Sequence, residues 1–108
     1  MPQRVHIFME YKIKKNKKQV YEAIMSEALQ ELNTYSIEDY QWFEAMDQEG
    51  LYVEMFSVET MAMYEEIKNA RTTLDHPFFS QWEDLVEGGL RKVHCWAFLK
   101  KDSKDSGG

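Results

Sequence analysis

Two residues of this sequence that could together move a proton are a histidine and a glutamate in two strand-like segments. Glu10 lies in segment 4–13 and His94 in segment 91–100. If these segments are antiparallel neighbours in a sheet, His94 lies near Glu10. A carboxylate beside an imidazole favours the protonated ring, and such a pair can act as a base or a proton shuttle near neutral pH. We therefore take His94 and Glu10 as the candidate catalytic pair; a structural hydrogen bond between strands is the alternative.

Large aromatic side chains form the second candidate site. An aromatic cavity can hold a planar organic molecule, with tyrosine hydroxyls and indole nitrogens to orient it. Seven methionines add adaptable, polarizable filling, which suits a ligand pocket or simple packing. Aromatic residues make good cores equally well, so a packed core is the alternative. The candidate ligand-binding residues are Tyr40, Trp42, Phe56, Trp82, Trp96 and Phe98.

A metal site is not expected. Glu44 and Glu54 share a face of two middle strands, where they would repel each other if buried, unless one is protonated or meets a cation. With His6 or His94 they could ligate a metal, but a metal site needs three or four ligands at fixed geometry, which strand parity alone does not establish. Cys95 is the only cysteine, which excludes an internal disulfide and a thiolate zinc site and predicts a buried structural thiol. We expect no cofactor.

The first half of the chain predicts a strand, a helix and a hairpin. Segment 4–13 is dense in β-branched and aromatic residues, as strands are. Apolar residues at three- and four-residue steps predict a helix that Asn16 caps and that runs to about Asn33. The runs 40–47 and 51–58 flank a short glycine-containing loop and should pair antiparallel.

The second half predicts a broken helical region and a last strand. Thr60 offers an N-cap for a short helix that breaks near Leu74. Pro77 sits where a second helix would begin, because proline in the first turn loses no amide partner. Gly88 is a natural left-handed cap at the end of that helix. Segment 91–100 reads as the last strand.

This order of elements is β-α-β-β-(α-α)-β, which matches the ferredoxin-like βαββαβ arrangement. The predicted fold class is α+β, with an antiparallel sheet and helices on one of its faces. We expect a single domain over residues 1–100, followed by a disordered polar tail, residues 101–108.

Strand alternation predicts which side chains face the helices. The helix-facing set is Val5, Ile7, Met9, Val53, Met55, Val93, Cys95 and Ala97. The opposite set is His6, Phe8, Glu10, Tyr40, Trp42, Glu44, Tyr52, Glu54, Phe56, His94, Trp96 and Phe98. Seven of these twelve are aromatic, which is too apolar for an open surface. We therefore predict a homodimer that closes sheet on sheet into a barrel.

Composition limits the class of protein. The chain has 108 residues, 44% hydrophobic and 30% charged, which suits one globular domain and excludes a disordered or repeat-built chain. Its formal net charge of -6 argues against nucleic acid as a partner, because no broad basic surface is available. Neither a signal peptide nor a membrane-spanning apolar run is visible, so we expect a cytoplasmic protein without membrane contact.

The layout resembles the dimeric α+β barrel superfamily, and particularly its antibiotic-biosynthesis-monooxygenase-like (ABM) branch. The resemblance spans about residues 4–100. Segment 50–59, Gly-Leu-Tyr-Val-Glu-Met-Phe-Ser-Val-Glu, is similar to that group's third strand entering a helix, and segment 76–79, His-Pro-Phe-Phe, to its broken helical region. Both are signals of shape rather than catalytic signatures.

The resemblance implies a ligand cavity without choosing a reaction. Superfamily members include cofactor-independent oxygenases of aromatic polyketides, haem-degrading oxygenases, isomerases and proteins with no known activity. The haem-degrading relatives have an asparagine where this chain has Glu10 and an iron-ligating histidine where it has Trp82. This difference argues against haem.

The leading interpretation is a small-molecule-binding protein that resembles cofactor-independent monooxygenases and oxidises a hydrophobic or aromatic compound. In that interpretation His94 and Glu10 remove a proton while the aromatic residues position the compound. The alternatives are a non-catalytic ligand-binding module and a purely structural dimer.

Overall fold

The computed structural model describes residues 3–101. The elements within them, in chain order, are β1 (Val5–Lys12), η1 (Lys15–Lys17), α1 (Lys18–Asn33), β2 (Glu38–Glu44), β3 (Leu51–Val58), α2 (Met61–Thr72), η2 (Phe79–Gln81), α3 (Trp82–Leu85), η3 (Leu90–Lys92) and β4 (His94–Leu99).

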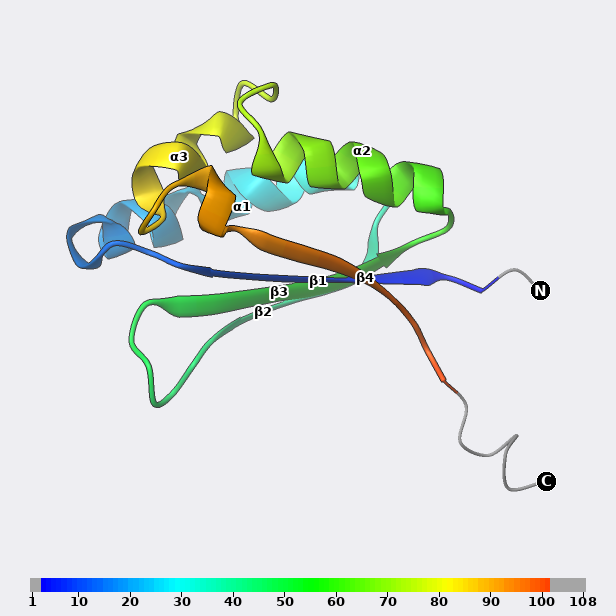
Figure 1. Ribbon diagram of the computed structural model, residues 1–108, viewed down its shortest axis with the longest axis horizontal. Helices are drawn as coiled ribbons and strands as arrows, with labels where there is room; N and C mark the ends of the chain where they lie inside the picture. The colour runs from blue at the N-terminus through cyan, green and yellow to red at the C-terminus, as the bar shows by residue number, and fades with distance from the viewer. Residues whose placement is uncertain (1–2, 102–108) are drawn as a thin grey trace.

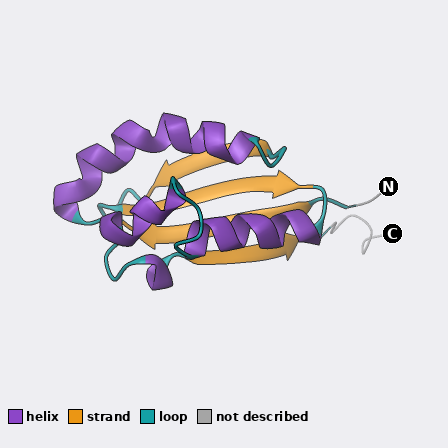
Figure 2. Ribbon diagram, turned by 90° about the horizontal axis from the view of Figure 1, so that it is seen from above, coloured by secondary structure: helices purple, strands orange, loops and turns teal. Residues whose placement is uncertain are grey.

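The four strands form one antiparallel sheet in the order β2-β3-β1-β4, and the helices cover one of its faces (Figures 1 and 2). This confirms the predicted α+β, ferredoxin-like fold. We call the sheet face toward the helices the inner face and the opposite one the outer face. No helix in the described part of the chain is long and apolar enough to cross a membrane.

Helix α1 follows its predicted apolar stripe but not its predicted cap. Tyr21, Met25 and Ala28 are buried at steps of four and three residues. Asn16 lies instead in the 3₁₀ turn η1, and no side chain caps the start of α1. The lysines around this start form ion pairs with other elements, so the first turn of α1 is anchored by tertiary contacts rather than by a cap.

The second helical region is shorter than predicted. Thr60 caps α2 as expected, since its hydroxyl accepts a hydrogen bond from the Met63 amide. The helix predicted from Pro77 to Gly88 is only a 3₁₀ turn followed by the four-residue helix α3. His76 starts this region: its Nδ1 accepts from the amides of Phe78 and Phe79.

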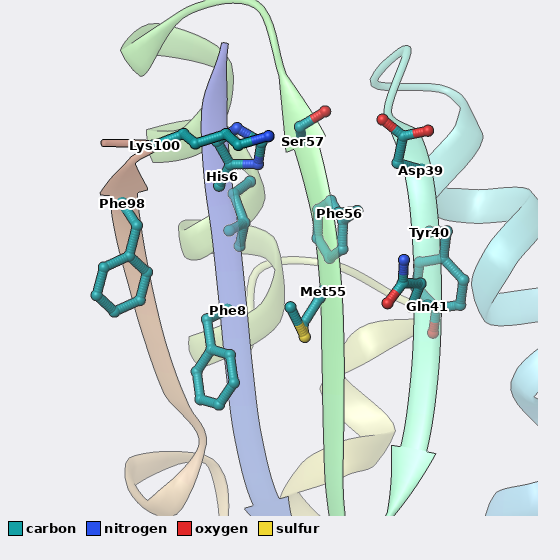
Figure 3. Close-up of a pocket in the computed structure, with 11 residues that line it drawn as sticks. His6, Phe8, Asp39, Tyr40, Gln41, Met55, Phe56, Ser57, Phe98 and Lys100 are labelled. Carbon is teal, nitrogen blue, oxygen red and sulfur yellow. The ribbon is translucent and has the colours of Figure 1, made fainter. Parts of the chain in front are cut away.

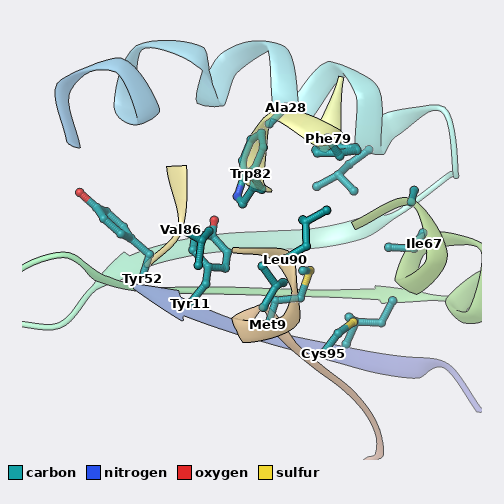
Figure 4. Close-up of a cluster of buried hydrophobic side chains, with 14 of the residues drawn as sticks. Met9, Tyr11, Ala28, Tyr52, Ile67, Phe79, Trp82, Val86, Leu90 and Cys95 are labelled. Carbon is teal, nitrogen blue, oxygen red and sulfur yellow. The ribbon is translucent and has the colours of Figure 1, made fainter. Parts of the chain in front are cut away.

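The core lies between the sheet and the helices (Figure 4). Trp82 sits at its centre without exposed surface, and packs against Tyr11 and Tyr21 edge to face. Burying one such indole removes a large apolar area from water, so α3 contributes to core stability although it is only four residues long. The predicted tail, residues 101–108, falls outside the described residues except for Lys101.

The predicted assignment of faces is confirmed for β1 and β4 and wrong for β2 and β3. On β1 and β4, Ile7, Met9 and Cys95 are buried as predicted. On β3 the relation is reversed: Met55 is 40% exposed on the outer face, while Phe56 is buried. The side chains that lie on the inner face instead of the outer one are Tyr40, Trp42, Glu44, Tyr52, Glu54 and Phe56.

The physical reason is that polar atoms on these strands find partners under the helices. Glu54 pairs with Arg71 of α2, and Tyr40 donates a hydrogen bond to Glu54. A buried carboxylate is tolerated when it is paired and hydrogen-bonded, so apolarity alone does not decide which parity faces inward.

Candidate functional site

Three rows of side chains cross the outer face of the sheet. Strand pairing places Phe98, His6 and Ser57 in one row, Trp96, Phe8, Met55 and Gln41 in the next, and His94, Glu10, Val53 and Phe43 in the third. Four large apolar side chains on this face are 40–54% exposed: Phe43, Met55, Trp96 and Phe98. Such a contiguous apolar surface usually marks a site for a ligand or a partner.

A groove of about 760 Å³ runs along one end of this face (Figure 3). Its volume is in the range of small-molecule sites. We call it the outer-face groove. It is lined by His6, Ile7, Phe8, Asp39, Tyr40, Gln41, Met55, Phe56, Ser57, Phe98 and Lys100.

The lining of the outer-face groove is divided into an apolar part and a polar end. Phe8, Met55 and Phe98 supply the apolar part, and the rings of Phe8 and Phe98 meet edge to face at 6.3 Å. His6 and Lys100 both line the polar end, on the same side of the groove (Figure 3). An amphipathic compound matches this division.

A β-bulge in β2 shapes the wall of the groove that lies opposite His6 and Lys100 (Figure 3). The pairing of β2 with β3 shifts register between Glu38 and Gln41, and Asp39 within this stretch has a φ of 59°. This left-handed conformation is uncommon for a residue other than glycine, although aspartate tolerates it better than most. Bulges of this kind redirect a side chain, and here Asp39 lines the groove.

An arginine fixes Ser57, one of the residues that line the polar end. Arg4 donates from Nε to the Ser57 hydroxyl at 2.8 Å and from its terminal nitrogen to the Ser57 carbonyl at 3.1 Å. The same nitrogen lies 3.9 Å from a carboxylate oxygen of Glu38. Ser57 is thereby fixed at the junction of β1, β2 and β3.

The predicted catalytic pair lies at the other end of the outer face. His94 and Glu10 are directly opposite each other in the ladder, as predicted. Among the described residues, neither forms a hydrogen bond or an ion pair with the other, and the His94 ring stacks on Trp96 with centroids 5.6 Å apart. Both line a small hollow of about 230 Å³, separate from the outer-face groove, together with Lys12 and Lys92.

The six predicted ligand-binding residues lie on two faces and do not form one cavity in a single chain. Trp96 and Phe98 are on the outer face, and Phe98 lines the groove. Tyr40 and Phe56 also border it, although the Phe56 side chain packs into the core. Trp42 and Trp82 lie on the helix side, where Trp82 is fully buried.

The inner face carries a polar cluster that sequence reasoning did not assemble. Glu54 and Arg71 form a bidentate ion pair with N–O distances of 3.0 and 2.6 Å, and neither side chain is exposed. Tyr40 donates to one Glu54 oxygen at 2.8 Å and Tyr11 to the other. The Arg71 guanidinium also lies 4.5 Å from the ring centroid of Phe79, a cation–π geometry.

A chain of hydrogen bonds runs into this cluster from the edge of the sheet. Tyr11 gives its one hydroxyl hydrogen to Glu54, so the 2.6 Å contact between the Tyr11 and Tyr21 hydroxyls requires Tyr21 as donor. The Trp42 indole N–H in turn donates to Tyr21 at 2.8 Å. Donors therefore point one way along the chain, toward the carboxylate of Glu54.

The pKa shifts follow from this arrangement. Burial acts to raise the pKa of Glu54, but the charge and hydrogen bonds of Arg71, with those of the two tyrosines, outweigh it and lower the pKa below its ordinary value of 4.5. Burial, followed by the charge of Glu54, raises the pKa of Tyr11 and Tyr40 far above the phenol range. Glu54 is thus held as a carboxylate and the phenols as donors.

Arg71 is the residue that sequence reasoning missed. It falls on the apolar stripe of α2, seven residues after Tyr64 and four after Ile67. A charged residue in a buried stripe, together with a glutamate inside an apolar strand, is the signal that could have identified the pair.

The other predicted polar residues have structural partners. Glu44 and Glu54 share a face as predicted, and each meets a cation: Glu44 lies 2.8 Å from Lys18, while Glu54 pairs with Arg71. The described residues hold no group of three or more histidine, cysteine or acidic side chains placed to bind a metal. Cys95 is buried, and burial raises the pKa of its thiol to about 11.

Comparison with known proteins identifies the fold and not a function. The sequence matches no protein-family model and no curated protein. Protein PA3566 from Pseudomonas aeruginosa is similar in structure, with a TM-score of 0.71, 12% identity, and coverage of 94% of this chain and 98% of that one.

Two further solved structures carry a functional description. A Bacteroides thetaiotaomicron protein described as a possible oxidoreductase has a TM-score of 0.61 at 11% identity, covering 93% of this chain and 100% of that one. Hydroxynitrile lyase from Passiflora edulis has a TM-score of 0.63 at 12% identity, covering 94% and 97%. At such identities the likeness concerns the fold alone, so this chain has the α+β fold of these small proteins.

Proposed function

We propose that this chain is a cytoplasmic small-molecule-binding protein of the ABM-like branch of the dimeric α+β barrels, and that it holds a hydrophobic or aromatic compound in the outer-face groove. The observation that carries the proposal is the groove itself: about 760 Å³, with an apolar part formed by Phe8, Met55 and Phe98 and polar groups at one end. Ligand sites combine an apolar lining with a few placed polar groups in this way. The shared fold with a possible oxidoreductase and a hydroxynitrile lyase supports a role with small organic molecules.

The proposal includes a homodimer in which the outer faces of two copies meet. Phe43, Trp96 and Phe98 are 42–54% exposed on this face, and an antiparallel sheet with one face covered normally keeps the other polar. A second copy packed here would remove these rings from water and would roof the groove. The alternative function is a structural dimer in which the same rings serve assembly only.

A matched pair of variants tests binding. We would titrate the protein with 2-naphthamide, a neutral planar probe, by isothermal titration calorimetry. Phe98→Ser removes a ring that lines the groove, whereas Phe43→Ser removes a similarly exposed ring of the same face outside it. We expect affinity to fall about tenfold in Phe98→Ser, the equivalent of ~1.4 kcal/mol, and to stay within about twofold in Phe43→Ser.

Sedimentation at the titration concentration supplies the control, because both rings lie on the face proposed for dimerisation. Variants are compared under conditions that give each the wild-type mass. Absence of binding by the wild-type protein at millimolar probe, or equal losses in the two variants, would refute the groove as the binding site.

Oxidation of the bound compound is the second candidate function, because an imidazole, His6, lines the groove. An aromatic compound with an acidic CH₂ group can react as R₂CH₂ + O₂ → R₂C=O + H₂O: a base removes a proton from carbon, the carbanion supplies the electrons, one oxygen atom enters the product and the other leaves as water. In this proposal His6 is the base. His94 with Glu10 remains the base predicted from sequence, at the other end of the face.

Oxygen uptake with anthrone, which carries such a CH₂ group, separates the two histidines. Loss of turnover with retained binding in His6→Ala, and not in His94→Ala, is the result expected for catalysis in the groove. The reverse pattern would assign the chemistry to His94 and Glu10. No uptake above the rate in buffer would leave the chain a binding protein.

A further inference from the structure

The charged groups of the outer-face groove are sorted onto opposite walls. Lys100, which directly follows β4, and His6, on β1, form one side, and Asp39, on β2, forms the other (Figure 3). Within residues 3–101, neither Lys100 nor His6 takes part in an ion pair. On this side of the groove Lys100 therefore offers a cationic donor and His6 a ring N–H, with no carboxylate of the described chain bound to either.

Ser57 adds a hydroxyl to the polar end. Its oxygen accepts the 2.8 Å hydrogen bond from Arg4, so its own hydrogen points elsewhere. No described group accepts that hydrogen, and the Ser57 side chain is 1% exposed and lines the groove. A buried hydroxyl of this kind gains free energy when a ligand supplies the missing acceptor.

The apolar part lies directly beside these donors. Phe8 occupies the row next to His6, and its ring is bordered by Phe98 edge to face and by Met55 in the ladder. An aromatic ring packed here would hold a substituent at its edge toward the polar end.

We propose that the groove selects an aromatic carboxylate, with the ring against Phe8 and Phe98 and the carboxylate toward Lys100, His6 and the Ser57 hydroxyl. This inference rests on the proposed binding function and names its ligand class. A carboxylate accepts hydrogen bonds only, and it gains most from donors that are charged or already oriented.

Asp39 provides an opposite test, because its negative charge should repel the carboxylate that Lys100 attracts. Asp39 lies at the bulge in β2 and lines the groove on the side away from Lys100 (Figure 3). Its field weakens the binding of an anion and leaves a neutral ligand almost unaffected. Neutralising Asp39 and neutralising Lys100 therefore change the affinity for a carboxylate in opposite directions.

The experiment compares two ligands that differ in charge and little in shape. We would measure the dissociation constants of 2-naphthoate and 2-naphthamide by calorimetry at low salt, for the wild-type protein and for Lys100→Gln, Asp39→Asn and Lys92→Gln. The last variant removes the same charge from an exposed lysine outside the groove and so controls for net charge.

We expect 2-naphthoate to bind about tenfold more tightly than 2-naphthamide. Lys100→Gln should weaken naphthoate about fivefold, Asp39→Asn should strengthen it two- to threefold, and Lys92→Gln should change it by less than twofold. Naphthamide should stay within twofold in all three variants.

The outcomes separate this inference from the binding function. Failure of both probes to bind would refute the groove as a binding site. If both bind equally well, or if Lys100→Gln weakens both alike, the carboxylate preference is wrong while the binding function stands. Equal effects of Lys100→Gln and Lys92→Gln would also overturn the inference, because the preference would then reflect net charge alone.

Discussion

Arg71 and Glu54 form a bidentate ion pair, at 3.0 and 2.6 Å, in which neither side chain has any exposed surface. The pair joins α2 to β3 across the core, and two phenols complete the contacts of the carboxylate. A pair of this kind fixes the position of the helix layer on the sheet, because any other position would leave a buried charge without its partner.

Removing one partner of this pair should destabilise the protein strongly. Arg71→Met leaves the Glu54 carboxylate buried without its cation and should cost about 3–5 kcal/mol of unfolding free energy. Urea unfolding measures it, and Arg71→Lys, which keeps the charge, provides a milder variant if Arg71→Met does not fold.

Arg4→Met is the control at a part-exposed arginine: it removes two hydrogen bonds to Ser57 and a 3.9 Å ion pair with the exposed Glu38. It should cost about 1–2 kcal/mol, less than Arg71→Met, because water can replace part of these contacts. Equal losses for the two arginines would show that burial of the Arg71 pair is not what matters.

The same pair predicts how stability depends on pH. The pKa of Glu54 is lowered in the folded state, so its contribution is fully present above the unfolded value of about 4.5 and is lost as pH falls through the folded pKa. The urea midpoint should hold above about pH 5.5 and decline below about pH 4.5.

The double variant Glu54→Leu with Arg71→Met lacks the titrating group. Its acid decline should be shallower than that of the wild-type protein. An unchanged acid decline would assign the effect to other carboxylates.

The half-buried Tyr40 and the buried Tyr52 allow a comparison of phenol donors. Tyr40→Phe removes the hydrogen bond to the buried Glu54 and should cost about 1.5–3 kcal/mol, the range for bonds to charged groups. Tyr52→Phe removes a bond to the exposed Glu22 and should cost less than about 1 kcal/mol, because water replaces it there. Thermal or urea unfolding gives both values, and a larger loss for Tyr52→Phe would contradict the central role of Glu54.

Cys95 should be chemically inert in the folded protein. Burial raises the pKa of its thiol to about 11, so little thiolate exists at pH 8. A thiol reagent such as Ellman's reagent should titrate no group in the native protein within minutes and one per chain in urea. Rapid reaction of the native protein would show that the inner face of β4 opens readily.

Assembly through the outer face should respond to a charge placed at its centre. Trp96→Asp puts a carboxylate among the exposed rings and should convert a dimer into single chains in sedimentation velocity. Met61→Asp, on the exposed start of α2, is the control and should leave the mass unchanged. A wild-type protein that sediments as one chain at high concentration would refute the dimer.

The sequence by itself determined the elements and their order. Residues 51–58 form strand β3 as predicted, because strand formation follows the local pattern of residue types. Thr60 caps α2 as predicted, because its hydroxyl accepts a hydrogen bond from the amide of Met63, only three residues away. The Asn16 cap failed for the complementary reason: ion pairs of Lys17 and Lys18 with distant carboxylates anchor that turn instead.

Only the tertiary structure decided which face of β2 and β3 turns inward, and with it the candidate site. Which face turns inward depends on Arg71, which lies seventeen residues after Glu54 in the sequence. Its guanidinium pairs with the Glu54 carboxylate and so allows that carboxylate to be buried. The groove depends likewise on the bulge at Asp39 and on the pairing of all four strands around His6 and Ser57. Alternation along one strand states which residues share a face, whereas the free energy of burying that face is set by partners from other elements.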